Sequence, residues 1–395
     1  MAVVIIGGGQ GGFQTAASLR AEGYQERITL IGEEAYVPYQ RPPLSKGYLL
    51  GKQEQRHAEL RPASFYEAHR ITLVTARAVA IDRVSRRVTL DSGEHIEYET
   101  LVLATGARNR PLPHERVFYL RTLSEAAELR QRLANAQDVV VVGGGFIGLE
   151  VAAVARTLNK QVTVIEGQER LMSRVVAPVV SEYFRGRHED KGVDILLNAA
   201  VSEIRENEVH LRDGTRRPAD LVIAGIGVIP NLELAREAGL PAGNGITVDA
   251  NLRTPDERIF AIGDCAECPN PFAEACVRLE SVQNAVDHAI CVAKAIVGRG
   301  APYSAVPWFW TDQYDIHLQM AGLPEGFDQV VTRGDLESGK FSVFYFRSGR
   351  LRAVDSINRP ADHLTSRKLI GARAMLSPDE AADESFDLKG VLPPP

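Results

Sequence analysis

Residues 139–150 read VVVVGGGFIGLE, and a near copy, VVIIGGGQGG, occupies residues 3–12. In each copy a short run of β-branched residues precedes glycines in the spacing G-x-G-x-x-G. Such a run predicts a parallel strand that is buried on both faces and turns tightly into a helix. Both copies therefore predict the strand–turn–helix unit that holds the pyrophosphate of a dinucleotide.

Each copy is also followed by the acidic residue that a dinucleotide site requires. The next apolar run after the first copy ends at Glu33, and the run after the second ends at Glu166, each about 20 residues beyond its turn. A carboxylate there accepts hydrogen bonds from ribose hydroxyls and repels an added 2′-phosphate. Glu166 thus favours NADH over NADPH, although the nearby Arg170 weakens this inference.

Three later segments fit a flavoenzyme with two nucleotides. YETLVLATGARNRP (98–111) and ADLVIAGIGVIPN (219–231) each predict an apolar strand that ends in a glycine turn, where the chain crosses between domains. TPDERIFAIGDCA (254–266) predicts a strand that leads to Gly263 and Asp264. Asp264 is placed either to bind the ribityl hydroxyls of a flavin or to cap the helix that follows.

The bulk composition narrows the function classes. A length of 395 residues predicts two or three domains, and a net charge of −6 argues against a nucleic-acid binder. The apolar run 139–155 contains consecutive glycines and Glu150, so a buried strand and helix are expected rather than a membrane span. No signal peptide is recognisable, and the cysteines are confined to 265–291, so a cytoplasmic protein is expected.

Together these segments resemble the NADH-dependent, FAD-containing ferredoxin reductases of bacterial oxygenase systems, the putidaredoxin reductase-like family with its rubredoxin reductase relatives. The similarity covers nearly the whole chain. It rests on IIGGGQGG, PYQRPPLSK (38–46), VLATGARNRPLP, YLRTLSEA, VVGGGFIGLEVAA, IFAIGDCA, LESVQNA and VPWFWTDQY (306–314).

The resemblance implies an α/β fold with two Rossmann-like dinucleotide-binding domains, for FAD and NAD, and a C-terminal α+β domain. The expected ranges are 1–107 with 241–304 for FAD, 108–240 for NADH, and 305–395 for the C-terminal domain on the ferredoxin side. Only the acidic, proline-ended tail 376–395 is of low complexity.

The resemblance also implies the residues of each site. For FAD they are Gly7, Gly9, Gly11, Gly12, Glu33, Arg41, Lys46, Val79, Thr105, Gly106, Arg121, Gly263, Asp264 and Val282. For NADH they are Gly143, Gly145, Ile147, Gly148, Glu166 and Gly227. The implied catalytic residues are Lys46 and Glu150, paired close to the flavin, and Trp310, facing the side on which the ferredoxin docks.

Lys46 has a physical case of its own. Pro42 and Pro43 stiffen the loop that carries it, because proline fixes the backbone angle φ. An ammonium group fixed near the N1–N5 edge of a flavin would stabilise an anionic reduced flavin. A solvated surface lysine is the alternative.

The function implied is hydride transfer from NADH to FAD, then single-electron transfers to a [2Fe-2S] ferredoxin that serves an oxygenase, with a haem monooxygenase system as the closest match. A rubredoxin as acceptor, an NADH-dependent flavin redox sensor of the apoptosis-inducing-factor type, and a non-specific NADH oxidase remain open. Residues 1–264 contain no cysteine, which argues against a disulfide reductase, and the C-x-x-C at 265–268 is a weak candidate dithiol. No metal site, nucleic-acid partner or membrane association is predicted.

Overall fold

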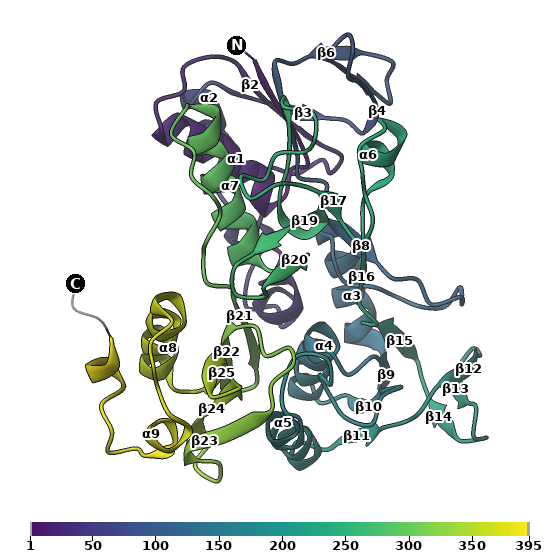
Figure 1. Cartoon of the computed structure of the whole chain (residues 1–395). Helices are drawn as coiled ribbons and strands as arrows, with labels where there is room; N and C mark the ends of the chain where they lie inside the picture. Colours follow the sequence, from purple (N-terminus) through teal and green to yellow (C-terminus); the bar gives the residue numbers. More distant parts are fainter. Residues whose placement is uncertain (1, 393–395) are drawn as a thin grey trace. The chain divides into compact units, whose positions relative to one another are not determined.

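The computed structural model describes residues 2–392, and the chain divides into two compact units (Figure 1). The first unit comprises Met1–Gln40, Ala58–Arg108 and Ile229–Pro307. The second comprises Arg41–His57, Asn109–Val228 and Trp308–Pro395. The expected domain ranges stay predictions, and their ends at Met1 and 393–395 lie outside the described residues.

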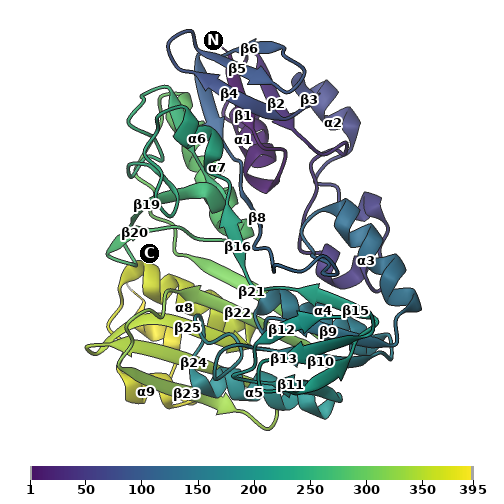
Figure 2. The ribbon, with the colours of Figure 1, turned by 90° about the vertical axis from the view of Figure 1, so that its right-hand side faces the viewer.

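The first unit is built on a parallel sheet in the order β18-β7-β1-β2-β3. The apolar run at the start of the chain forms β1 (Val3–Ile6), which pairs in parallel with β2 (Ile28–Gly32) and β7 (Thr100–Leu103). Helices α1 (Gln10–Ala21) and α7 (Val282–Ile296) lie side by side, as Figures 1 and 2 both show. The remaining elements are α2 (Ala63–Ala68), β3 (Ile71–Thr75), β4 (Ala78–Asp82), β5 (Arg87–Leu90), β6 (His95–Glu97), α6 (Glu233–Glu237), β17 (Ile246–Thr247), β18 (Ile259–Ala261), η3 (Gly263–Cys265), β19 (Ala266–Asn270) and β20 (Ala275–Val277).

The second unit repeats the parallel arrangement in the order β11-β10-β9-β15. Here β9 (Asp138–Val142) runs into α4 (Phe146–Thr157), and β10 (Gln161–Ile165) follows and pairs with β9 in parallel. Other elements of this part are η1 (Leu44–Tyr48), η2 (Gln55–His57), α3 (Leu123–Asn135), α5 (Pro178–Asp190), β11 (Val193–Leu196), β12 (Val201–Ile204), β13 (Glu208–Leu211), β14 (Arg216–Pro218) and β15 (Leu221–Ala224). Two short strands, β8 (Ala107–Asn109) and β16 (Val228–Pro230), contain two of the points at which the chain passes between the units.

A five-stranded antiparallel sheet in the order β21-β22-β25-β24-β23 completes the second unit (Figure 2). Its strands are β21 (Trp308–Gln313), β22 (Ile316–Gly322), β23 (Gln329–Asp335), β24 (Lys340–Arg347) and β25 (Arg350–Ile357). Helix α8 (Pro360–Ala372) packs on β25 and β22, followed by α9 (Pro378–Ala382) and the turn η4 (Leu388–Val391). The two parallel sheets and this antiparallel sheet confirm the predicted fold class.

The core of the antiparallel sheet holds a buried acid. The phenol of Tyr345 donates a hydrogen bond to the carboxylate of Asp355 on the neighbouring strand. The phenol oxygen also accepts a 2.8 Å hydrogen bond from the backbone N–H of Ala177, at the start of α5. Burial raises the pKa of Asp355 to about 7, because a charged carboxylate is poorly solvated there.

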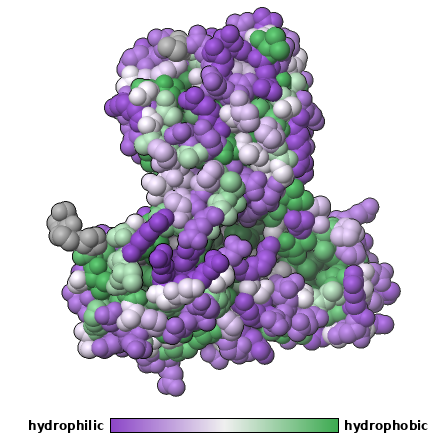
Figure 3. Space-filling view, viewed as in Figure 1, coloured by the Kyte–Doolittle hydropathy of each residue, from purple (hydrophilic) through white to green (hydrophobic). Residues whose placement is uncertain are grey.

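Hydrophilic residues predominate on the face shown in Figure 3, with apolar residues interspersed. Within residues 2–392, no helix has the length and apolar character needed to cross a membrane.

Asp355→Asn should flatten the pH dependence of stability. The folded protein holds the Asp355 proton more tightly than the unfolded chain, whose carboxyl titrates near 4. Stability is therefore lost as the pH rises from about 4 to about 7, by up to about 4 kcal/mol. Urea unfolding of the holoprotein at pH 5 and pH 8 should show the part of this loss that falls above pH 5, about 3 kcal/mol, in the wild type and not in the variant. Asp315→Asn, a change at an exposed carboxylate, is the control; parallel curves for all three proteins would contradict the assignment.

Candidate dinucleotide sites

In the first glycine turn, backbone contacts leave no room for a side chain at the two outer glycines. Gly7 follows β1 with φ of +121°, and a Cβ there would lie 2.0 Å from the carbonyl oxygen of Ala104. A Cβ at Gly12 would lie 1.9 Å from the carbonyl oxygen of Gly7. These two glycines let α1 approach the sheet closely, which is the role of the outer glycines in a dinucleotide turn.

The middle of the same turn is open. A Cβ at Gly9, the N-cap of α1, would meet nothing within 4 Å, and its φ of −82° suits any residue. A Cβ at Gly11 would approach Ile262 and Ala285, so the turn meets the start of α7. Open space at a helix N-terminus with free N–H groups fits a pyrophosphate.

Other residues predicted for FAD lie in the first unit, and Gly263 approaches the same Ala285 as Gly11 of the turn. Gly263, with φ of +70°, precedes Asp264 in η3, and a Cβ there would lie 3.4 Å from Ala285. Val282 opens α7. Thr105 donates a 2.8 Å hydrogen bond to the carbonyl of Asn231, and Gly106 adopts φ of +63°. Glu33 follows β2, and Val79 lies on β4 with 42% of its surface exposed.

The second glycine turn has the same construction. Gly143 has φ of +109°, and a Cβ there would lie 2.5 Å from the carbonyl oxygen of Gly225. A Cβ at Gly148 would lie 2.0 Å from the carbonyl oxygen of Gly143, whereas at Gly145 the nearest atom is 4.0 Å away. Ile147, in the first turn of α4, is an exposed large apolar residue. Gly227 adopts φ of +97°.

Hydrogen bonds hold the Glu166 carboxylate against the second glycine turn. Its Oε2 accepts a 2.6 Å hydrogen bond from the N–H of Gly144, and its Oε1 accepts one of 2.8 Å from Gln168. A carboxylate has about four acceptor positions, so capacity remains for ribose hydroxyls.

Arg170 is engaged elsewhere. Its guanidinium donates to the carbonyls of Ser173 and Val176, at 2.6 and 2.7 Å, and to the hydroxyl of Ser181 at 2.8 Å. These bonds secure the loop before α5. The ambiguity that Arg170 introduced at the sequence level is thereby reduced.

The remaining predicted residues gather in the second unit. Lys46, in the irregular turn η1, forms an ion pair of 2.8 Å between its Nζ and Oε1 of Glu150 on α4. Glu150 is 3% exposed, and the Lys46 side chain is 22% exposed. Arg41 donates a 2.5 Å hydrogen bond to the backbone carbonyl of Arg121. The expected contact between Lys46 and Glu150 is present, and the roles of all these residues in binding and catalysis stay predictions.

The sequence analysis did not predict three further residues, each of which contacts Glu150 or one of its partners. The hydroxyl of Ser45 donates to Oε2 of Glu150, and that of Thr311 donates to Oε1 at 2.6 Å. Gln313, two residues on, contacts Thr311. One signal was available: in WFWTDQ, residues 311 and 313 share one face of a strand, and both are polar.

Trp310 lies on the same strand. It is partly exposed, and its ring centroid is 5.5 Å from that of Trp308. Trp308 in turn lies under the guanidinium of Arg367, whose carbon is 4.9 Å from the ring centroid. An indole that is partly exposed and held by a second indole can serve as a rigid contact for a partner.

The two cysteines of the C-x-x-C segment, Cys265 and Cys268, are unsuited to redox chemistry. Both are free thiols. The thiol of Cys265 donates to backbone carbonyls in the core. The sulfur of Cys268 lies 3.7 Å from Nε2 of His288, whose Nδ1 accepts a hydrogen bond from the N–H of Gly263. Burial raises the pKa of both thiols, that of Cys268 to about 12, so neither forms the reactive thiolate readily.

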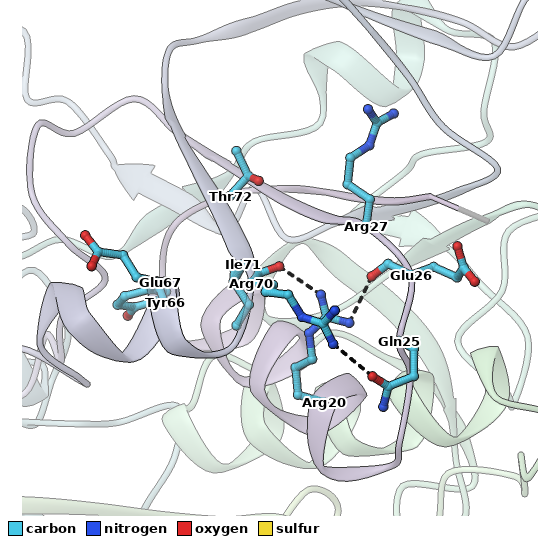
Figure 4. A pocket seen from close by; sticks show the side chains of 9 residues that line it. All are labelled: Arg20, Gln25, Glu26, Arg27, Tyr66, Glu67, Arg70, Ile71 and Thr72. Atoms are coloured by element: carbon cyan, nitrogen blue, oxygen red, sulfur yellow. Dashed lines mark hydrogen bonds between the residues drawn. The ribbon is translucent and has the colours of Figure 1, made fainter.

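A pocket elsewhere in the first unit is not the dinucleotide site. Arg20, Arg27, Arg70 and Tyr66 are among its lining residues (Figure 4). It lies where β2 and β3 begin, whereas the glycine turn follows the end of β1, which runs parallel to β2. The guanidinium of Arg20 donates to several backbone carbonyls, among them those of His69 and Arg70, so its role is structural.

Comparison with known proteins agrees with this geometry. Residues 1–289 match a family model described as pyridine nucleotide-disulphide oxidoreductase, and residues 308–392 match one described as reductase C-terminal. Rhodocoxin reductase of Rhodococcus erythropolis is 50% identical over 400 residues, which cover 98% of this chain and 94% of that protein.

Two solved structures are similar over almost the whole chain. The ferredoxin reductase for the CYP199A2 system from Rhodopseudomonas palustris has a TM-score of 0.97 at 47% identity, covering 99% of this chain and 100% of that one. The covalent putidaredoxin reductase–putidaredoxin complex has a TM-score of 0.96 at 42% identity, covering 99% of this chain and 97% of that one. These matches confirm the resemblance drawn from the sequence.

Alanine at the central glycines should separate binding from folding. Gly9→Ala and Gly145→Ala fit the backbone but fill the space expected for a pyrophosphate. We expect Gly9→Ala to lose FAD, read from the visible absorption of the purified protein. Gly145→Ala should keep FAD but raise the KM for NADH, by about tenfold or more, as for 1.4 kcal/mol of lost binding.

Gly12→Ala is the matched control, because it forces overlap with Gly7 and should give little folded protein. Full flavin content in Gly9→Ala and an unchanged KM in Gly145→Ala would contradict both site assignments.

Proposed function

We propose that this chain, which belongs to the pyridine nucleotide-disulphide oxidoreductase family, is an NADH:ferredoxin oxidoreductase of an oxygenase system. The oxidoreductase class and the use of FAD with a nicotinamide dinucleotide are those predicted from the sequence, and the family matches confirm them. When bound, FAD supplies the conversion of a two-electron hydride into two single electrons. The acceptor in the proposal is a [2Fe-2S] ferredoxin.

The observation that carries the proposal is the pair of glycine turns. In each turn, a side chain at either outer glycine would overlap backbone atoms. The central glycine, at a helix N-terminus, has open space beside it. In the proposal the turn at Gly9 binds the pyrophosphate of FAD, and the turn at Gly145 binds that of NADH. Glu166 accepts hydrogen bonds from the NADH ribose.

Lys46 and Glu150 supply fixed charge at the reacting centre. In the proposal the Lys46 ammonium lies beside the isoalloxazine ring and stabilises negative charge there. Glu150, buried and ion-paired, holds the ammonium in place and lies near the nicotinamide. Trp310 shields the ring from water and contacts the ferredoxin.

The cysteines support single-electron transfer as the exit route. A disulfide reductase needs a thiolate, and burial disfavours it at Cys265 and Cys268. Free cysteines are also typical of a reducing compartment, so the proposal places the enzyme in the cytoplasm.

Stopped-flow mixing tests the proposal directly. The purified holoprotein is reduced with NADH and then mixed, without oxygen, with a [2Fe-2S] ferredoxin and in parallel with a rubredoxin. Fast flavin oxidation by the ferredoxin is expected. Preference for the rubredoxin would move the assignment to rubredoxin reductase, and a long-lived reduced state with both would favour a redox sensor. Rapid consumption of oxygen without any partner would favour an NADH oxidase.

Glu166→Ala should relax the preference for NADH over NADPH. The substitution removes the carboxylate that repels a 2′-phosphate. We expect the ratio of kcat/KM values to fall by about tenfold or more, because tenfold is about 1.4 kcal/mol and a like-charge contact costs at least that much. Glu169→Ala, at an exposed neighbouring acid, controls for general charge. An unchanged ratio in Glu166→Ala would remove Glu166 from the ribose site.

Trp310→Ala should slow electron transfer to ferredoxin more than reduction by NADH. The indole lies on the proposed exit path and takes no part in hydride delivery. Stopped-flow rates for the two half-reactions measure each effect, and Trp310→Phe, which keeps an aromatic ring, should be intermediate. Equal slowing of both half-reactions by the alanine variant would refute the proposed exit role.

A further inference from the structure

A chain of hydrogen bonds crosses the interior of the second unit and ends on Glu150. It passes through Thr311 and Gln313 on β21 and His188 near the end of α5, and it begins at Tyr314. Thr311, Gln313 and His188 are each 0% exposed. Polar side chains this deeply buried are costly unless each finds a partner.

Ionised Glu150 fixes the direction of every bond in the chain. A carboxylate only accepts, so the Thr311 hydroxyl donates to Oε1, at 2.6 Å. The Thr311 oxygen is then free to accept the 3.3 Å bond from the amide nitrogen of Gln313. That orientation turns the amide oxygen of Gln313 toward Nε2 of His188, at 2.8 Å.

The same hydrogen bonds determine which ring nitrogen of His188 carries the proton. Nε2 of His188 carries the proton, so Nδ1 is an acceptor and the phenol of Tyr314 donates to it, at 3.3 Å. Burial lowers the pKa of His188, which keeps the imidazole neutral with a single N–H. Burial also raises the pKa of Tyr314, so the phenol keeps its proton.

Every donor in this chain therefore points toward Glu150. Aligned hydrogen bonds polarise one another, which strengthens the last bond to the carboxylate. Oε1 is also the atom that binds Nζ of Lys46, at 2.8 Å, while Oε2 accepts from Ser45. The far end of the chain thus acts on the atom that holds Lys46.

We propose that Thr311, Gln313 and His188 are positioning residues, a polarised relay that fixes the Glu150 carboxylate and through it the Lys46 ammonium. This inference rests on the proposed function, in which Lys46 lies beside the flavin. The relay links α5 and β21 to the reacting centre, although none of its three members contacts a cofactor in the proposal.

The test compares Thr311→Val, which keeps the branched shape but lacks the hydroxyl, with Thr311→Ser, which retains it. Thr311→Val should lower the rate constant for flavin reduction at saturating NADH by about ten- to a hundredfold, the scale of a misplaced catalytic group. It should also make the flavin midpoint potential more negative, because a Lys46 ammonium that Glu150 no longer holds in place stabilises the reduced flavin less. Thr311→Ser should restore both values.

A double-mutant cycle with Gln313→Met distinguishes a relay from independent packing effects. Gln313→Met alone should shift both quantities in the same direction but less. The double variant should match Thr311→Val, because without the hydroxyl Gln313 has no route to Glu150. Additive effects, or a Thr311→Val protein that loses thermal stability but keeps the wild-type potential, would overturn the relay.

The potential is measured by chemical reduction and does not depend on NADH. If the wild type were not reduced by NADH, the proposed function would fail, and the potentials of the variants would still decide whether the relay acts on the flavin.

Discussion

The close approach of backbone to backbone at the glycine turns is the constraint on which the rest of the structure depends. At Gly12 and Gly148 a single methyl group would overlap a carbonyl oxygen, so α1 and α4 reach their sheets only because both positions lack a side chain. That approach directs each helix N-terminus toward open space at Gly9 and Gly145. The same contact therefore sets the packing of two sheets and creates two places for a pyrophosphate.

The turns could be predicted from the sequence because their constraint is local. Strand, glycines, helix and acid follow one another along the chain, so their spacing alone indicates both dinucleotide units. The contact between Lys46 and Glu150 joins residues far apart in the chain, and only the resemblance to known reductases pointed to it. Nothing in the spacing of either segment indicates that contact.

The sequence did not indicate which polar segments and side chains are buried, because burial depends on the fold and not on local composition. The segment after 376 reads as a low-complexity acidic tail, yet Leu376, Ala381 and Leu388 belong to a core cluster with Phe344 and Phe346. A few well-placed apolar residues suffice to anchor a polar segment. Likewise, His188 and Asp355 read as ordinary polar residues until the fold encloses them.

Two buried carboxyl groups of the second unit, those of Asp355 and Glu150, differ in whether a cation compensates their charge. Among residues 2–392 no cation pairs with Asp355, and burial raises its pKa to about 7. Its hydrogen bond from Tyr345 connects β24, β25 and the start of α5. Glu150 is also buried, but the ammonium group of Lys46 lies beside its carboxylate and compensates the negative charge. A buried ion pair of this kind adds little stability by itself, because desolvation offsets the attraction. Its persistence in the core, supported by donors from Ser45 and Thr311, is better explained by a requirement to hold one ammonium group in a fixed position.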